Sequence, residues 1–164
     1  MILRCTAKLL SLLRSTKASV AAPPSAATDW YANLLWFERR KCLLVTHSGT
    51  LFSIFVPDVS VVQFRPIGRL VVPLIKEALL TEELPPDTFG VLKPDDVVIA
   101  RTADRSVLGS MNDMALMLEW RIAARGGLKS CDVVQLNRQL RQEMSATRGY
   151  VTPLELAQRW QRLG

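Results

Sequence analysis

The sequence predicts a single α+β domain with a mainly antiparallel sheet and about four to five helices. Three strand-like runs, rich in β-branched and aromatic residues, follow one another early in the chain at residues 31–37, 41–46 and 51–56. Apolar residues with helical spacing dominate the second half of the chain. Strands and helices therefore cluster separately instead of alternating, which favours an α+β architecture over a parallel α/β one.

The composition is that of an ordinary globular domain. The chain has 164 residues, of which 49% are hydrophobic and 22% charged. Residues 1–164 fit one domain, and a chain of this size buries roughly 70% of its unfolded surface without needing disulfides or metal. The uninterrupted apolar stretches are much shorter than the ~20 residues of a transmembrane helix, so we expect no membrane partner.

The N-terminal segment is predicted to begin with a strand, Met1–Cys5, and to continue with a short helix, Ala7–Ser15, capped by Thr6. Leucines of this helix would contact the core. A targeting peptide is the alternative, because the segment is basic and contains no acidic residue before Asp29. Residues 16–28 are rich in Ala, Ser and Pro and are predicted to form a flexible linker.

The three early strands are predicted to pair as a meander. A charged quartet, Glu38–Lys41, separates the first two strands, and a turn at residues 47–50 leads into the third. Residues 63–84 then follow helical spacing with Pro73 inside the pattern. Either the helix starts at Pro73 or it is kinked there.

The remaining elements are predicted to be a hairpin and three helices. Residues 97–102 and 107–111 have the pattern of two paired strands. A helix is predicted at residues 114–125, begun by a capping box in which Ser110 faces Asp113. This helix is apolar around most of its circumference, so we expect it to be the most buried one, with Trp120 in the core. For the last two helices the predicted caps are Ser130 or Asp132, and then the sequence Thr152-Pro153-Leu154-Glu155.

Four blocks of sequence resemble an uncharacterised family of small bacterial proteins, a domain of unknown function. They are Arg4-Cys5-Thr6 with Leu9-Leu10, Trp30-Tyr31-Ala32-Asn33-Leu34, Arg39-Arg40-Lys41-Cys42, and Gly109-Ser110-Met111-Asn112-Asp113. The similarity covers the chain from Met1 to about Leu154. It implies a bacterial, cytosolic setting and supports the N-terminal strand, but it provides no catalytic residues.

The residues that commonly bind metals are few and scattered. Cys5, Cys42 and Cys131 are widely spaced without a CxxC pair, and His47 is the only histidine. We therefore expect three reduced thiols in a cytoplasmic protein, and neither a metal nor a cofactor. His47 is predicted to be a solvent-exposed residue of a hairpin turn.

Two polar clusters are candidate binding residues. Arg39, Arg40 and Lys41 follow Trp36, and cations beside an aromatic ring can bind single-stranded nucleic acid. Asn112 and Asp113 fall at a predicted strand-to-helix junction, where an anion can bind. Each cluster also has a simpler interpretation: a solvated turn for the first and helix capping for the second.

Other basic residues decorate the last two helices. Their predicted outer faces carry glutamines together with Arg138, Arg141, Arg148, Arg159 and Arg162. Such faces suit a nucleic acid, an acidic partner or plain solvent. Moreover, four cations precede Asp29, so much of the net charge of +6 belongs to the N-terminus and says little about nucleic acid.

Two functions fit these observations. The first is a small non-catalytic binding or regulatory module for a protein or nucleic-acid partner. The alternative is an enzyme acting on a phosphorylated or nucleic-acid substrate, with Arg39–Lys41, Asn112 and Asp113 as its polar groups. A pocket that groups Asn33 with Asn112 and Asp113 would favour the enzyme.

Overall fold

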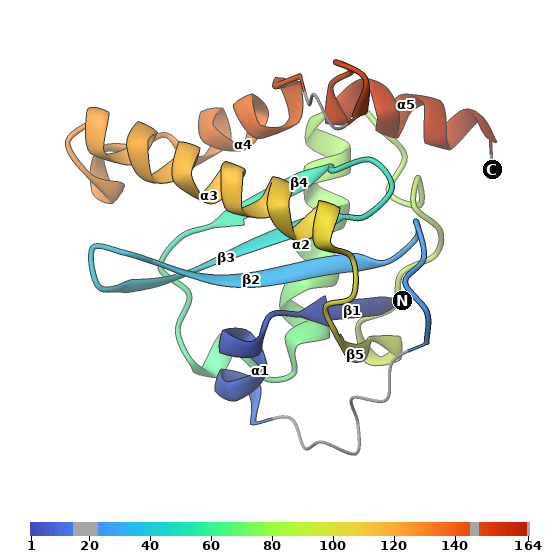
Figure 1. Cartoon of the computed structure of the whole chain (residues 1–164), viewed down its shortest axis with the longest axis horizontal. Helices are drawn as coiled ribbons and strands as arrows, with labels where there is room; N and C mark the ends of the chain where they lie inside the picture. The colour runs from blue at the N-terminus through green and yellow to red at the C-terminus, as the bar shows by residue number, and fades with distance from the viewer. Residues whose placement is uncertain (15–22, 145–147, 164) are drawn as a thin grey trace.

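The molecule is a five-stranded mixed sheet with helices on both faces (Figure 1). The computed structural model describes residues 1–14, 23–144 and 148–163. The greater part of the predicted linker, residues 16–22, therefore lies outside the described residues. The α+β class predicted from the sequence is confirmed.

The sheet has the strand order β4-β3-β2-β1-β5. Three strands form the predicted antiparallel meander: β2 (Trp30–Phe37), β3 (Arg40–His47) and β4 (Ser53–Val56). The N-terminal strand β1 (Ile2–Cys5) is also confirmed, and it lies parallel to both β2 and β5 (Val98–Arg101). The sheet is thus antiparallel on one side and parallel on the other.

In the part of the chain that the structure describes, five helices pack around this sheet. The long helices α2 (Ile67–Thr81) and α3 (Arg105–Ala124) cover opposite faces of it (Figure 1). The shorter ones are α1 (Ala7–Leu13), α4 (Val133–Gln142) and α5 (Pro153–Leu163). Within the described residues, short 3₁₀ turns occur at Val62–Phe64, Pro94–Asp96 and Leu128–Ser130.

Alternation along the strands produces two cores. In β2, Trp30, Ala32 and Leu34 join the core under α2, whereas Tyr31 and Phe37 join the core under α3. Both faces of the sheet are therefore buried near its centre, which explains why β2 and β3 are apolar almost throughout and not only at every second residue.

The predicted hairpin at residues 97–111 is wrong. Val98–Arg101 is a strand, but it pairs in parallel with β1, and residues 107–111 lie inside α3. The carboxylate of Asp104 caps α3 by accepting hydrogen bonds from the backbone N–H groups of Ser106 (2.8 Å) and Val107 (3.3 Å). Because this cap lies six residues before Ser110, the predicted capping box at Ser110 is wrong too.

The other helix boundaries agree better with the sequence. The helix α2 begins at Ile67, so Pro73 lies inside it and not at its start. Asp132 caps α4 through the N–H of Gln135. At α5 the capping box forms as predicted: Thr152 Oγ1 accepts from the Glu155 N–H, and Glu155 Oε2 accepts from the Thr152 N–H.

None of the helices within the described ranges has the length and apolar character needed to span a membrane.

Candidate docking surface

The β2–β3 connection is a two-residue turn. Phe37 pairs with Arg40, which leaves Glu38 and Arg39 as the turn, with φ values of 49° and 63°. Positive φ at both positions is the geometry that matches the twist of a tight hairpin. The charged quartet predicted from the sequence is therefore divided: Arg39 lies exposed at the tip, while Arg40 and Lys41 are the first residues of β3.

The three cations of this segment have different surroundings. Arg40 forms an ion pair with Asp58. The Nζ of Lys41 lies 4.7 Å from the centroid of the Trp36 ring, so it covers one face of that ring. Arg39 makes no hydrogen bond or ion pair with any residue that the structure describes. Of the three, Arg39 can therefore contact a partner without giving up an existing contact.

The turn is fixed against the loop that follows α3. Glu38 Oε1 accepts a hydrogen bond of 3.0 Å from the backbone N–H of Leu128. Gly127 makes room for this carboxylate, because a Cβ at that position would lie 2.5 Å from Glu38 Oε1, and its φ is 111°. The end of the hairpin and the end of α3 consequently form one continuous surface.

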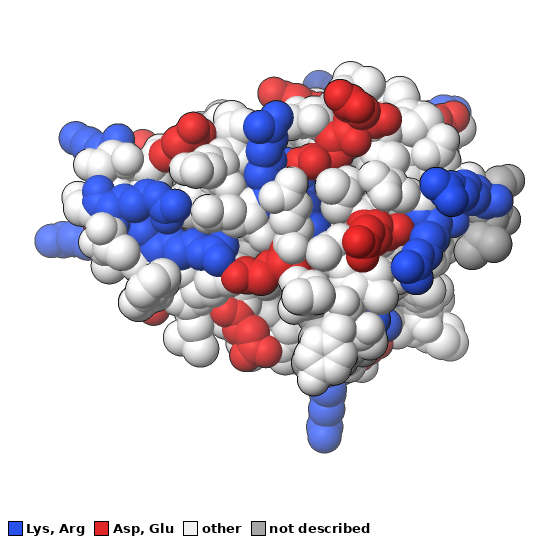
Figure 2. Space-filling model, turned by 90° about the horizontal axis from the view of Figure 1, so that it is seen from above, with Lys and Arg blue, Asp and Glu red and all other residues white. Residues whose placement is uncertain are grey.

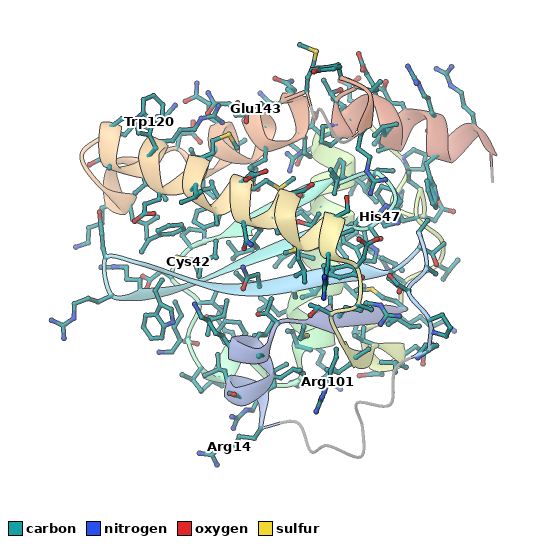
Figure 3. All side chains as sticks on the ribbon, viewed as in Figure 1. Arg14, Cys42, His47, Arg101, Trp120 and Glu143 are labelled. Atoms are coloured by element: carbon teal, nitrogen blue, oxygen red, sulfur yellow. The ribbon has the colours of Figure 1, made fainter. Side chains whose placement is uncertain are left out.

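The outer side of α3 is apolar and exposed. Val107, Met111, Leu118 and Ile122 face the sheet and are buried. Leu116 and Trp120, one turn apart on the other side, are 65% and 71% exposed. Figure 3 shows Trp120 pointing away from the sheet. The prediction that this helix is the most buried one, with Trp120 in the core, is wrong, because the sheet covers only one of its two apolar sides.

A groove of about 340 Å³ lies between α3 and the end of β2. Its lining residues are Leu35, Trp36 and Phe37 from β2 and Asn112, Ala115, Leu116 and Glu119 from α3. Trp36 is 53% exposed. Its ring alternates with Leu35 and Phe37 and so lies on the other face of the sheet, and the groove borders the strand at Trp36. We call this groove, together with Leu116 and Trp120, the α3 surface.

The structure brings some of the predicted binding residues together on this surface. Trp36 and Asn112 line the same groove, and Arg39 and Lys41 lie at its hairpin end. Asp113 is exposed and does not line the groove, and neither does Asn33, which accepts a hydrogen bond from Thr6 Oγ1. Both Asn112 and Asp113 lie in the middle of α3, so the predicted anion site at a strand-to-helix junction is not formed.

Lys and Arg side chains gather at the two ends of the molecule (Figure 2). One end is where Figure 1 places the β2–β3 turn and the connection from α3 to α4. That end carries exposed Arg39 and Lys129 and partly exposed Arg125. The hairpin end of the α3 surface is therefore positively charged.

His47 is buried, which corrects the prediction of an exposed turn residue. Its ring contacts Trp30, Phe89 and Trp160, and its Nδ1 lies 3.0 Å from Thr50 Oγ1. Burial, with a smaller contribution from the charge of Arg148, lowers the pKa of His47 to about 3. A neutral histidine enclosed by aromatic rings stabilises the core and does not reach solvent.

Two arginines predicted to face outward hold the fold together instead. Arg141 is buried and forms an ion pair with Glu82 (2.7 Å), and its Nη1 donates to the carbonyl of Ser53. Arg148 donates to the carbonyl of Ser48 at 2.7 Å. The same kind of contact occurs at Arg4, which pairs with buried Asp29. Several arginines of this chain thus stabilise the fold and do not contribute surface charge.

Sequence reasoning missed Leu116 and Trp120 as surface residues. The available signal was the apolar character of the helix on all sides, which in a chain of this length is more than one sheet face can cover. All three cysteines are free, and Cys5 and Cys42 are core residues, as expected.

The molecule is a small α+β domain with an exposed apolar helix face. The chain belongs to the family described as Domain of unknown function (DUF6933), which it matches over residues 2–156. No curated protein and no solved structure shows significant similarity to it.

Proposed function

We propose that this protein is a non-catalytic binding module whose α3 surface docks another protein. The observation that carries the proposal is the exposure of Leu116 and Trp120, one turn apart and next to the Trp36 groove. Soluble proteins seldom expose large apolar side chains in one place unless a partner covers them. Tryptophan is also among the residues that contribute most to binding at protein interfaces.

A protein fits this surface better than a nucleic acid does. The exposed faces of Leu116 and the neighbouring Ala123 and Ala124 are aliphatic, so they offer neither stacking nor phosphate contacts. One face of the Trp36 ring is already occupied by Lys41.

The alternative of an enzyme receives less support from the same residues. Its proposed polar groups are dispersed, because Asn112 lines the groove whereas Asp113 and Asn33 do not. The single histidine is enclosed by aromatic rings and is uncharged at neutral pH, so it does not contact a substrate in this conformation. We further propose a bacterial, cytoplasmic setting; the three free thiols support the cytoplasmic part of this proposal.

The proposal can be tested with one substitution and a matched control. Leu116→Glu places a charge in the α3 surface. The control, Leu80→Glu, places the same charge at a leucine of α2 that is 61% exposed and does not line the groove. A random peptide library displayed on phage is selected on the immobilised wild-type protein. Selected peptides are then synthesised, and their affinities for the three proteins are measured by fluorescence anisotropy.

We expect selected peptides to bind the wild type and the Leu80→Glu variant equally and to lose at least tenfold in affinity for Leu116→Glu. Both variants should melt like the wild type, because each replaced side chain is exposed. Failure to enrich any peptide, or peptides that bind all three proteins equally, would contradict the proposal.

A further inference from the structure

The sheet has an unpaired stretch next to the groove. β1 pairs with β2 only from Trp30 to Ala32, whereas β2 continues to Phe37. On its other side, β2 is paired with β3 along its whole length. Figure 1 shows β2 running well past the end of β1.

The direction of the peptide groups in this stretch follows from one hydrogen bond. The carbonyl of Ala32 accepts from the N–H of Thr6 at 3.0 Å, so the peptide groups of Ala32 point away from β3. Every second residue of a strand points its N–H and C=O to the same side, so those of Trp36 also point away from β3. Within the described residues, no hydrogen bond reaches the backbone of Trp36.

The β4 edge of the sheet is closed by side chains. On β4, the Asn137 amide bonds to both the N–H (2.6 Å) and the C=O (2.9 Å) of Phe55, and Arg141 donates to the carbonyl of Ser53. Proteins usually protect strand edges in such ways, since an open edge pairs readily with another chain. The backbone of Trp36 therefore lacks the protection that the β4 edge has.

We propose that an extended segment of the partner protein adds to the sheet at Trp36. This inference rests on the proposed function and names the mode of binding. The segment's backbone bonds to the N–H and C=O of Trp36, as in strand addition to a sheet edge. Alternate side chains of the segment then point to opposite faces of the sheet, one toward the groove under α3 and the next toward the side of the Trp36 ring.

The charges beside this edge specify an acidic segment. Lys41 pairs directly with Trp36 across the hairpin, and Arg39 lies exposed at the tip. Carboxylates on the segment would meet both cations. A second copy of this chain, added at the same edge, would instead bring the cations of two hairpins together, so a different protein with an acidic segment is the occupant that we infer.

Two substitutions of Trp36 distinguish the contribution of its backbone N–H to binding from that of its side chain. Trp36→Ala removes the ring and keeps the N–H. Trp36→Pro removes the ring and the N–H, and because this N–H points away from β3, the hairpin ladder stays intact. The probe is a synthesised peptide taken from the library selection, and its affinity for each variant is measured by fluorescence anisotropy.

The proline variant should bind the peptide about three- to tenfold more weakly than the alanine variant. The exchange of the Trp36 amide hydrogen in the wild type, followed by NMR, should slow at least tenfold in the complex, a readout that remains if the proline variant does not fold. Selected peptides should also carry Asp or Glu.

Equal affinities of the two Trp36 variants, with an unprotected amide, would overturn strand addition and leave the proposed docking intact if Leu116→Glu still abolishes binding. Unchanged binding to Leu116→Glu would overturn the proposed function itself. A dimer of the wild type that Trp36→Pro dissociates and Trp36→Ala does not, seen by light scattering, would replace the acidic segment with a second copy.

Discussion

The side chain of Asn137 acts as a strand partner for Phe55. Its Oδ1 accepts from the Phe55 N–H at 2.6 Å and its Nδ2 donates to the Phe55 carbonyl at 2.9 Å, so one residue of α4 makes both bonds of a ladder pair. The same helix supplies Arg141, which bonds to the carbonyl of Ser53. α4 therefore closes the β4 edge. Within the described residues, no side chain closes the open stretch of β2 in this way.

Asn137→Ala should destabilise the protein by about 1–3 kcal/mol, because it leaves two partly buried peptide groups without a partner. Urea unfolding followed by circular dichroism measures the change. Gln135→Ala, at an exposed position of the same helix, is the control and should stay within about 0.5 kcal/mol of the wild type. Equal stability of the two variants would mean that water replaces Asn137 without cost.

Replacing Trp30 and replacing Trp120 by alanine should have very different effects on the stability of the protein. Trp30 is fully buried between His47 and Phe89, so Trp30→Ala should cost about 3–5 kcal/mol. Trp120 is 71% exposed, and Trp120→Ala should cost less than about 1 kcal/mol. Thermal melts of both variants check the difference. A large loss of stability for Trp120→Ala would show that the residue belongs to the core.

The central part of the fold could be predicted from the sequence because local signals and tertiary structure agree there. Dense apolar strands, a first-turn proline and a capping-box glutamate fix the meander and α5 through local chemistry alone. The same holds for β1, whose apolar run pairs as a strand.

The remaining assignments failed where tertiary contacts decide. Residues 107–111 have strand-like composition, but the Asp104 cap and the sheet face beneath them make them helical. His47 has the polar flanks of a turn residue, yet three aromatic rings from distant parts of the chain enclose it. The groove joins residues about 80 positions apart, and no periodicity reveals such a pairing.

The burial of His47 should make the protein sensitive to acid. In the unfolded chain, His47 has an ordinary pKa of about 6.5 and takes up a proton below that pH, whereas in the folded protein its pKa of about 3 keeps it neutral. The unfolded state therefore binds more protons between pH 6.5 and 3. Stability is fully present above this window and falls within it by up to about 1.4 kcal/mol per pH unit as the pH decreases.

The contribution of His47 to the pH dependence of stability can be separated from that of the carboxylates by comparing the wild type with His47→Gln, because the carboxylates are present in both proteins. The free energy of unfolding, measured in urea at several pH values, should fall less steeply with acid in the variant. Parallel pH profiles would contradict the burial of a neutral histidine.

The cations of the hairpin provide a test against nucleic acid as the partner. Arg40 is engaged by Asp58 and Lys41 by the Trp36 ring, so Arg39 is the one free to contact phosphate. We expect oligonucleotides to bind weakly and only at low salt. Arg39→Ala should then flatten the slope of log affinity against log salt by about 0.7–0.9.

The triple variant Arg39→Ala, Arg40→Ala, Lys41→Ala completes the salt titration against single- and double-stranded oligonucleotides. Tight binding by the wild type at physiological salt, with a slope that flattens by about 2–3 units in the triple variant, would move the function to nucleic acid. Binding with an unchanged slope would place the contact on other arginines, such as Arg159 and Arg162 of α5.

The four tryptophans report directly on whether a partner occupies the α3 surface. Trp120 lies exposed on it and Trp36 lies exposed at the strand edge where the partner segment is proposed to add, while Trp30 is buried under α2 and Trp160 packs against His47. In a ¹⁵N-labelled sample, each indole N–H gives its own NMR signal, and Trp→Phe variants assign the four. Saturation with a selected peptide should shift the Trp36 and Trp120 signals and leave those of Trp30 and Trp160 nearly unchanged. A peptide that binds with the reverse pattern, or without shifting Trp36 and Trp120, would contradict docking at the α3 surface.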